Sequence, residues 1–344
     1  MAQDPDDRRS IFVVGSSRSG TTMMGRILNR HPTVYTFHEL HVFEQMWSPG
    51  TGTFTNRAEA VDVAARLLHL QRDAGYLSHD DNSSAYRADA EALVEKGPPV
   101  HDTGPLDVYR TVLFREAAEH GAQVPCEQTP RNIFYLETIL ERFPGARVLH
   151  MVRDPRDVLL SQKRKWKRHF LGASNIPLTE AFRSWVNYHP ITISQLWRAS
   201  VQAVAPFRTH PRVRTVAFEE ALDTPAATVR EICEFVEIPF QEQMLSVCQI
   251  GSSNQEDRPN QRGIDPSRSG TWREGGLSDT EVFLCENVAA GPMGKHRYEP
   301  AGVRPNPLRL VLSALLFPVK VGTAFLLNLP RMDDVWDALR RRLQ

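Results

Sequence analysis

The sequence lacks an excess of charge of either sign. Its 344 residues include 41 lysines and arginines and 41 aspartates and glutamates, so the formal net charge is zero. A protein that binds nucleic acid through the phosphate backbone usually has a basic excess. The balanced charge therefore argues against nucleic acid as a partner.

Cysteines are also few and lie far apart. Cys126, Cys233, Cys248 and Cys285 include no close pair, so they do not resemble a disulfide framework or a zinc site. Reduced thiols are typical of a cytoplasmic protein. The first seven residues are polar and acidic and lack the apolar core of a secretory signal. The sequence therefore predicts a cytoplasmic location.

A third absence concerns the glycine-rich loop near the N-terminus. Gly15 and Gly20 are separated by four residues, which is the spacing of a Walker A motif. That motif continues with Lys and then Ser or Thr, whereas this chain has Thr21 and Thr22. The lysine that would contact the terminal phosphates of a nucleoside triphosphate is missing. An ordinary P-loop kinase or NTPase is therefore disfavoured and stays as an alternative.

What surrounds this loop indicates an anion site. Four apolar residues, 11–14, precede it and predict a strand buried on both faces, and apolar residues at helical spacing follow in 23–28. A strand, a glycine loop and a helix direct backbone N–H groups and the positive helix end at a phosphate or sulfate. Arg18 is the single cation within the loop. Amides, hydroxyls and one guanidinium would bind the anion.

Two motifs, in order along the chain, resemble the sulfotransferases that use 3′-phosphoadenosine 5′-phosphosulfate (PAPS). Gly-Ser-Ser-Arg-Ser-Gly-Thr-Thr is similar to the 5′-phosphosulfate loop, in the form of the tyrosylprotein and bacterial branch. Arg153 and Ser161 stand eight residues apart after a second apolar strand, as the family's 3′-phosphate pair does. The resemblance implies that the 5′-phosphosulfate binds to Gly15, Ser16, Ser17, Arg18, Ser19, Gly20, Thr21 and Thr22.

The resemblance also implies catalytic roles. Arg18 would stabilise charge on the transferring group and on the leaving phosphate. The family offset from the loop arginine places the catalytic base at Glu39, where a carboxylate can take the proton of an acceptor hydroxyl. His38 and His41 flank Glu39 and are rival bases. All three residues could instead be surface polar groups.

Three further stretches bear on the site, and one of them departs from the family pattern. The late segment 266–274 resembles a loop that closes over the nucleotide, so Arg268 would reach the 3′-phosphate, and Trp272 would either wall the adenine or simply pack. Gln128 replaces a family lysine that assists the departing phosphate, and Arg131 is a substitute cation. The basic run 163–169 is either a solvated helix face or an attractor for an anionic ligand.

The resemblance implies an α/β, P-loop-like three-layer fold with a central parallel sheet and flanking helices over about residues 10–300. We expect strands near 11–14, 34–37, 147–152 and 213–218, helices near 106–120 and 133–143, and one helix or a pair over 179–204, kinked at Pro190. Residues of about 47–100 would form an insertion beside the acceptor site or an ordinary helical excursion.

The tail, residues 301–344, differs from the rest. Its apolar run 308–329 contains Arg309, Pro318 and Lys320 and is followed by three consecutive arginines at 340–342. An internal charge and a proline argue against a simple membrane span. Three interpretations stay open: a helix packed on the domain, a contact in a homodimer, or an interfacial membrane anchor.

The predicted function is transfer of a sulfuryl group from PAPS to an acceptor hydroxyl of a sugar, lipid, phenol or tyrosine. The family mechanism is an in-line displacement without a covalent enzyme intermediate or a required metal. Besides a kinase or NTPase, a non-catalytic nucleotide-binding module of the same fold stays as an alternative, because Gln128 removes the usual second cation.

Overall fold

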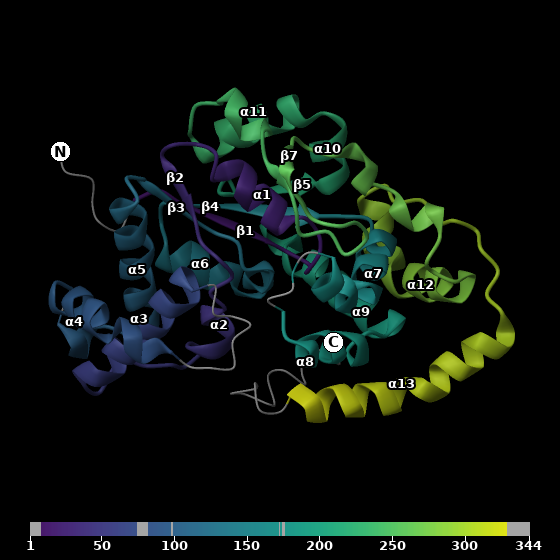
Figure 1. Ribbon diagram of the computed structural model, residues 1–344, viewed down its shortest axis with the longest axis horizontal. Coiled ribbons are helices and arrows are strands. Elements are labelled where there is room, and N and C mark those ends of the chain that lie inside the picture. The colour runs from purple at the N-terminus through teal and green to yellow at the C-terminus, as the bar shows by residue number, and fades with distance from the viewer. Residues whose placement is uncertain (1–7, 74–81, 98, 172, 174–175, 329–344) are drawn as a thin grey trace.

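A five-stranded parallel sheet forms the middle layer of the computed structural model (Figure 1), which describes residues 8–73, 82–97, 99–171, 173 and 176–328. The spatial order of the strands is β2-β3-β1-β4-β5, and every neighbouring pair is parallel. The strands are β1 Ser10–Gly15, β2 Val34–Thr36, β3 Val124–Glu127, β4 Ala146–Val152 and β5 Val213–Ala217. The predicted fold class is confirmed.

Side chains of β1 show why the fold has three layers. Phe12 and Val14 point into one core cluster, with helices α3 (Arg57–Arg72), α5 (Pro105–Glu119) and α6 (Leu136–Arg142). Ile11 and Val13 point into another, with α1 (Thr21–Leu28) and α11 (Pro225–Val236). All four side chains are at most 1% exposed. A strand covered by helices on both sides needs consecutive apolar residues, which is the observed pattern.

The other elements surround this sheet. The α-helices are α2 Val42–Gln45, α4 Arg87–Glu95, α7 Pro155–Lys163, α8 Leu178–Val186, α9 Pro190–Ala203, α10 Phe218–Asp223, α12 Asp279–Lys295 and α13 Pro307–Asn328. The short strands β6 (Cys248–Gln249) and β7 (Arg258–Arg262) form an antiparallel pair. The 3₁₀ segments are η3 Ser83–Tyr86, η4 Val100–Asp102, η5 Pro130–Tyr135, η6 Lys165–Phe170, η7 Ala205–Phe207, η8 Glu242–Leu245, η9 Pro266–Arg268 and η10 Thr271–Glu274.

One predicted helix boundary is wrong. The segment 133–135, expected to be α-helical, belongs to η5, and α6 begins only at Leu136. Pro130 opens η5, and the Asn132 amide is held by the Glu127 carboxylate, so local side-chain bonds shape this turn before the helix starts. The stretch 179–204 is the pair of helices α8 and α9, with Pro190 as the first residue of α9, where a missing N–H costs little.

Residues 47–100 are largely helical where the structure describes them. Helices α3 and α4 pack on each other and, through α3, on α5, so their apolar side chains extend the core cluster on one face of the sheet. This packing fits the alternative of a helical excursion. The described residues of this stretch contribute nothing to the lining of the cleft presented below.

Parallel strands bring distant parts of the sequence together at one edge of the sheet. The chain leaves β1 at Gly15, β4 at Val152 and β2 at Thr36, all at the carboxyl ends of the strands. Ligand sites of open α/β sheets lie outside this edge. The glycine loop, Arg153 and Glu39 therefore converge there.

Candidate active site

A cleft of about 430 Å³ opens at this edge of the sheet. Its walls come from the loop between β1 and α1, from residues 38–39, from the turn between β4 and α7, and from the segments 247–255 and 263–271. Of the predicted site residues, those that line it are Ser17, Arg18, Gly20, Thr21, Thr22, Glu39, Arg153, Ser161 and Arg268. Most of the predicted site thus converges on one cavity.

The remaining loop residues give the turn its shape. The Ser19 hydroxyl donates to the Ser16 carbonyl at 2.6 Å, and Ser19 is fully buried. Gly15 has φ 150°, and a Cβ atom there would lie 2.4 Å from the Met151 carbonyl oxygen, so only glycine fits. Helix α1 then begins at Thr21, which sets its unpaired N–H groups at this end of the cleft.

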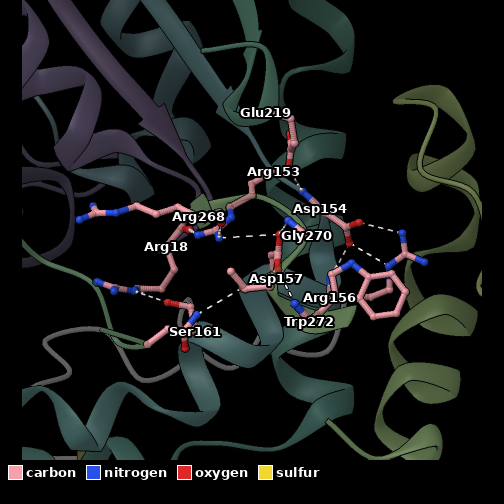
Figure 2. A network of polar contacts seen from close by, with 12 residues as sticks. Arg18, Arg153, Asp154, Arg156, Asp157, Ser161, Glu219, Arg268, Gly270 and Trp272 are labelled. Atoms are coloured by element: carbon pink, nitrogen blue, oxygen red, sulfur yellow. Dashed lines mark hydrogen bonds and ion pairs between the residues drawn. The ribbon is translucent and has the colours of Figure 1, made fainter. Parts of the chain in front are cut away.

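Arg18 links the loop to two other walls, and Figure 2 shows its bond to Ser161 on one of them. Its Nε donates to the Ser161 hydroxyl at 3.0 Å, and one Nη donates to the Gly251 carbonyl and the Ser253 hydroxyl, both at 2.9 Å. Burial and the neighbouring arginines Arg168 and Arg153 lower the pKa of Arg18 to about 10. The guanidinium therefore keeps its charge at neutral pH while it lies among other cations.

Arg153 joins the glycine loop to the late loop 266–274 through hydrogen bonds of its guanidinium. Its two Nη groups donate to the backbone carbonyls of Arg18, at 3.3 Å, and Arg268, at 2.6 Å, and its guanidinium covers the Phe218 ring at 4.3 Å. The Nε is buried and has no hydrogen-bond acceptor among the described residues. A buried arginine donor at a cleft suits an anionic ligand.

Asp157 fixes the late loop that Figure 2 shows beside Arg153. Its carboxylate, 0% exposed, accepts from the Gly270 N–H at 2.8 Å, the Thr271 hydroxyl at 2.8 Å and the Trp272 N–H at 2.9 Å. Three donors satisfy a buried charge that would otherwise be costly. The same bonds hold Arg268 and Thr271 in the cleft wall.

Trp272 lies behind this wall. Its ring is 9% exposed, packs with Leu160 and Val282, and has the Arg156 guanidinium 4.0 Å above it. It does not line the cleft. This geometry favours the packing alternative. The role of Trp272 as a wall of the adenine site stays a prediction.

Glu39 lies at the cleft with a single close ionic neighbour on its own segment. Its Oε2 is 3.3 Å from the Nε2 of His41, and its side chain is 34% exposed. His38 also lines the cleft, and burial, together with Arg26, lowers its pKa. His41 is buried, has φ 51° and lies outside the cleft lining. Of the two rival bases, His38 alone reaches the cavity.

A buried carboxylate holds the segment that bears Glu39. Glu127, at the end of β3, accepts from the Thr129 N–H at 3.0 Å, from the Thr129 hydroxyl and from the Asn132 amide at 2.5 Å. The Thr129 hydroxyl oxygen in turn accepts from the backbone N–H groups of Leu40, at 3.0 Å, and His41, at 3.4 Å. Burial raises the pKa of Glu127 to about 7.

Gln128 points away from the cleft. Its Nε2 donates to the Phe37 carbonyl at 2.9 Å, and it is absent from the lining. Arg131, the predicted substitute cation, is exposed and also absent from the lining. Neither residue adds to the charge of the cavity.

Two other arginines add this charge instead, and one of them, Arg168, comes from the basic run 163–169, which fits the alternative of an attractor for an anionic ligand. Arg26 lies one turn after Thr22 in α1 and donates to the Ile250 carbonyl at 2.8 Å, and Arg168 of η6 donates to the Ser252 carbonyl at 3.0 Å. With Arg18, Arg153 and Arg268, five arginines line the cleft against two carboxylates, Glu39 and Asp265. Because residues four apart lie on the same face of a helix, Arg26 could have been predicted to face the cleft together with Thr22. The segment 247–255 carried no motif.

A family model matches residues 10–242, and its description is the sulfotransferase family. The chain belongs to this family. Human carbohydrate sulfotransferase 5 is 24% identical over 333 residues, which cover 86% of this chain and 79% of the relative. The omega-hydroxy-beta-dihydromenaquinone-9 sulfotransferase Stf3 of Mycobacterium bovis is 27% identical over 162 residues, 42% of each chain.

Solved structures agree on the fold. The sulfotransferase domain from the olefin synthase of Synechococcus PCC 7002 superposes with a TM-score of 0.50 and 22% identity, covering 87% of this chain and 99% of that domain. This sulfotransferase-family chain thus shares its sheet and helical layers with a solved member, and it is a transferase by family.

Proposed function

We propose that this protein transfers a sulfuryl group from PAPS to an acceptor hydroxyl. The observation that carries the proposal is the meeting, in one cleft, of the 15–22 loop with Arg153 and Ser161, which lie more than 130 residues away along the chain (Figure 2). Two anion-binding groups in one cavity, one on the glycine loop and one on the β4–α7 turn, suit a nucleotide with phosphate groups at both its 5′ and 3′ positions.

The residues present fit such a ligand. A volume of about 430 Å³ lies within the range of roughly 300–1,000 Å³ that small-molecule sites usually have. The excess of three arginines over carboxylates in the lining favours an anion. Ser17, Thr21, Thr22 and the N-terminus of α1 would hold the 5′-phosphosulfate. Arg153, Ser161 and Arg268 would hold the 3′-phosphate.

When bound, PAPS supplies an electrophilic sulfur with a phosphate as leaving group. Glu39 supplies the proton acceptor in this proposal, because it is a partly exposed carboxylate that lines the same cleft. His41, 3.3 Å away, orients that carboxylate. Arg18 keeps its charge at neutral pH and would offset negative charge that develops on the transferring group and the leaving oxygen.

The charge of the cleft lining weakens the ground on which Gln128 raised the alternative of a non-catalytic module. The family lysine at this position would contribute a cation, and its replacement by Gln128 raised the alternative of a module that binds a nucleotide without catalysis. Gln128 instead holds the Phe37 carbonyl, while Arg26 and Arg168 add two cations to the lining. The loss of the lysine is therefore matched by charge from elsewhere.

The acceptor is proposed only as a class. The names of the two relatives indicate a carbohydrate and an omega-hydroxylated menaquinone as their acceptors, and both offer a hydroxyl. A hydroxyl of a sugar, lipid, phenol or tyrosine stays the proposed acceptor for this chain.

Sulfur-labelled PAPS, incubated with the purified protein and fractionated cell extract, tests the proposal. We expect label in an extract component whose mass rises by one SO₃ group, and no such product with Glu39→Gln. Binding of adenosine 3′,5′-bisphosphate without transfer in any fraction would identify a non-catalytic module. Hydrolysis of ATP in place of both would indicate an NTPase.

A further inference from the structure

Large apolar side chains are exposed in one region of the described chain. They are Phe170 on η6, Leu178, Phe182 and Trp185 on α8, and Leu308, Val311, Leu312, Leu315, Leu316, Val319 and Leu326 on α13. We call this surface the outer apolar face. Scattered exposed apolar residues are normal, but gathering on adjacent elements marks an interaction site.

Helix α13 leaves most of its apolar surface outside the domain. The stripe that faces the domain is mixed: Phe317 packs on His189 and Ala324 is buried, while Lys320 donates to the Tyr188 carbonyl at 3.1 Å and the Asn328 amide donates to the Asn187 side chain at 2.9 Å. The larger apolar stripe points outward, with Leu308 78% and Leu315 67% exposed. Since packing on a core buries the apolar stripe, this arrangement argues against the packed-helix interpretation of the tail.

Helix α8 repeats the pattern beside it. Leu178, Phe182 and Trp185 are exposed at the i, i+4 and i+7 positions of one helix face, whereas Glu180 is buried. The two helices are in contact, and the Lys320 ammonium lies 5.2 Å from the centre of the Trp185 ring. Figure 1 shows α13 running along the underside of the domain next to α8. The outer apolar face is therefore continuous over both helices.

The charges on these elements indicate what covers the face. Three cationic residues of these elements are exposed, Lys165 and Lys167 of η6 and Arg309 of α13, and no acidic residue of the three elements is exposed. Glu180 is buried and paired with Arg183, and Arg168 faces the cleft, where it pairs with Asp257. A second copy would bring two cationic faces together. An anionic lipid surface matches both the apolar side chains and the positive charge.

We propose that the outer apolar face docks this protein onto an anionic phospholipid bilayer, with α13 lying in the plane of the interface. The 22 residues of α13 are long and apolar enough to cross a membrane. Crossing would break the bonds that Ser313, Lys320 and Asn328 make with the domain, spread over about 22 Å of the helix at 1.5 Å per residue. An in-plane helix keeps them.

Docking would bring the rim of the cleft to the lipid. Segment η6 carries Arg168 in the cleft wall and Phe170, 63% exposed, on the outer apolar face, two residues apart. Docking itself does not depend on the proposed sulfuryl transfer, so each can fail without the other.

Vesicle flotation with the full chain tests the proposal. The probes are vesicles of phosphatidylcholine alone and of phosphatidylcholine with phosphatidylglycerol. We expect floating protein with the anionic vesicles, less at high salt, and at least tenfold weaker binding after Leu315→Glu with Val319→Glu. The control pair Ala227→Glu with Ala290→Glu adds the same charge at exposed positions of α11 and α12 and should bind like the wild type.

Sedimentation velocity on the same variants separates the competing occupant. A concentration-dependent dimer that Leu315→Glu with Val319→Glu abolishes, without flotation of the wild type, would make the face a homodimer contact and overturn the proposal. Equal binding of the two double variants would overturn it as well. Circular dichroism and binding of adenosine 3′,5′-bisphosphate report whether each variant has kept its fold.

Discussion

The two walls of the cleft are built differently. On the wall that we propose binds PAPS, the donor wall, Arg18, Arg153 and Asp157 are tied by hydrogen bonds to two loops, at Gly251 and at 268–270, and Asp157 is fully buried. On the wall that we propose meets the acceptor, the acceptor wall, Glu39 is 34% exposed, and its segment is held mainly through its backbone by Thr129. The donor wall is therefore more tightly held by side-chain hydrogen bonds than the acceptor wall, which fits the role that we propose for each.

The largest effect should come from the acceptor wall. Glu39→Gln keeps the size of the side chain and removes the proton acceptor, so kcat should fall by about 10²–10⁴ while donor affinity stays almost unchanged. Steady-state kinetics with the identified acceptor measures this. His38→Ala is the control, because His38 lines the same cleft and should cost much less. A dead His38→Ala enzyme beside an active Glu39→Gln enzyme would move the base to the histidine.

On the donor wall, Arg18→Ala should lower kcat by about 10²–10³, which is typical for loss of one preorganised donor at developing charge. Arg26→Ala and Arg168→Ala test whether the other cations of the lining share that role. We expect smaller losses of kcat in those two variants than in Arg18→Ala. A near-normal rate in Arg18→Ala, with a large loss in either of the others, would reassign the charge stabilisation.

Arg153→Ala should act on donor affinity. Each hydrogen bond to a charged group contributes roughly 1.5–3 kcal/mol, so adenosine 3′,5′-bisphosphate should bind at least about tenfold more weakly. Lys167→Ala is the matched control, since Lys167 is an exposed cation outside the cleft lining. Calorimetry that finds the two variants equal would remove Arg153 from the 3′-phosphate site.

The smallest effect concerns the buried anchor of the acceptor wall. Burial raises the pKa of Glu127 from 4.5 to about 7 in the folded protein. A raised carboxyl pKa contributes stability below about pH 4.5, and that contribution is lost as the pH rises through about 7. The free energy of unfolding should therefore fall from pH 5 to pH 8 by more in the wild type than in Glu127→Gln. Urea unfolding at both pH values measures the difference, and parallel curves would contradict it.

The meeting of the glycine loop with Arg153 and Ser161 in one cleft could be predicted from the sequence because these residues lie in short contiguous motifs. Gly15, Arg18 and Gly20 lie within one short loop. Arg153 and Ser161 stand eight residues apart, on the turn and the helix that follow a strand. Strands buried on both faces have runs of apolar residues, so 11–14 and 147–152 were recognisable as strands of a parallel sheet.

Other parts of the site depend on tertiary packing and left no local pattern. Arg168 enters the cleft from a basic run that also fits a solvated face, and the 247–255 wall has no motif at all. A tryptophan in this late loop suggests a contact with the nucleotide, yet the Trp272 ring packs behind the loop, under the Arg156 guanidinium. The orientation of Gln128 follows from the Phe37 carbonyl, a backbone group that a sequence does not place in space.

Calorimetry of the wild-type protein with adenosine 3′,5′-bisphosphate and with AMP is the sharpest test of the proposed 3′-phosphate site. These ligands differ by the 3′-phosphate alone, which Arg153 and Ser161 are proposed to bind. We expect at least about tenfold tighter binding of the bisphosphate, the equivalent of one charge-assisted hydrogen bond. Equal affinity for both nucleotides would contradict it.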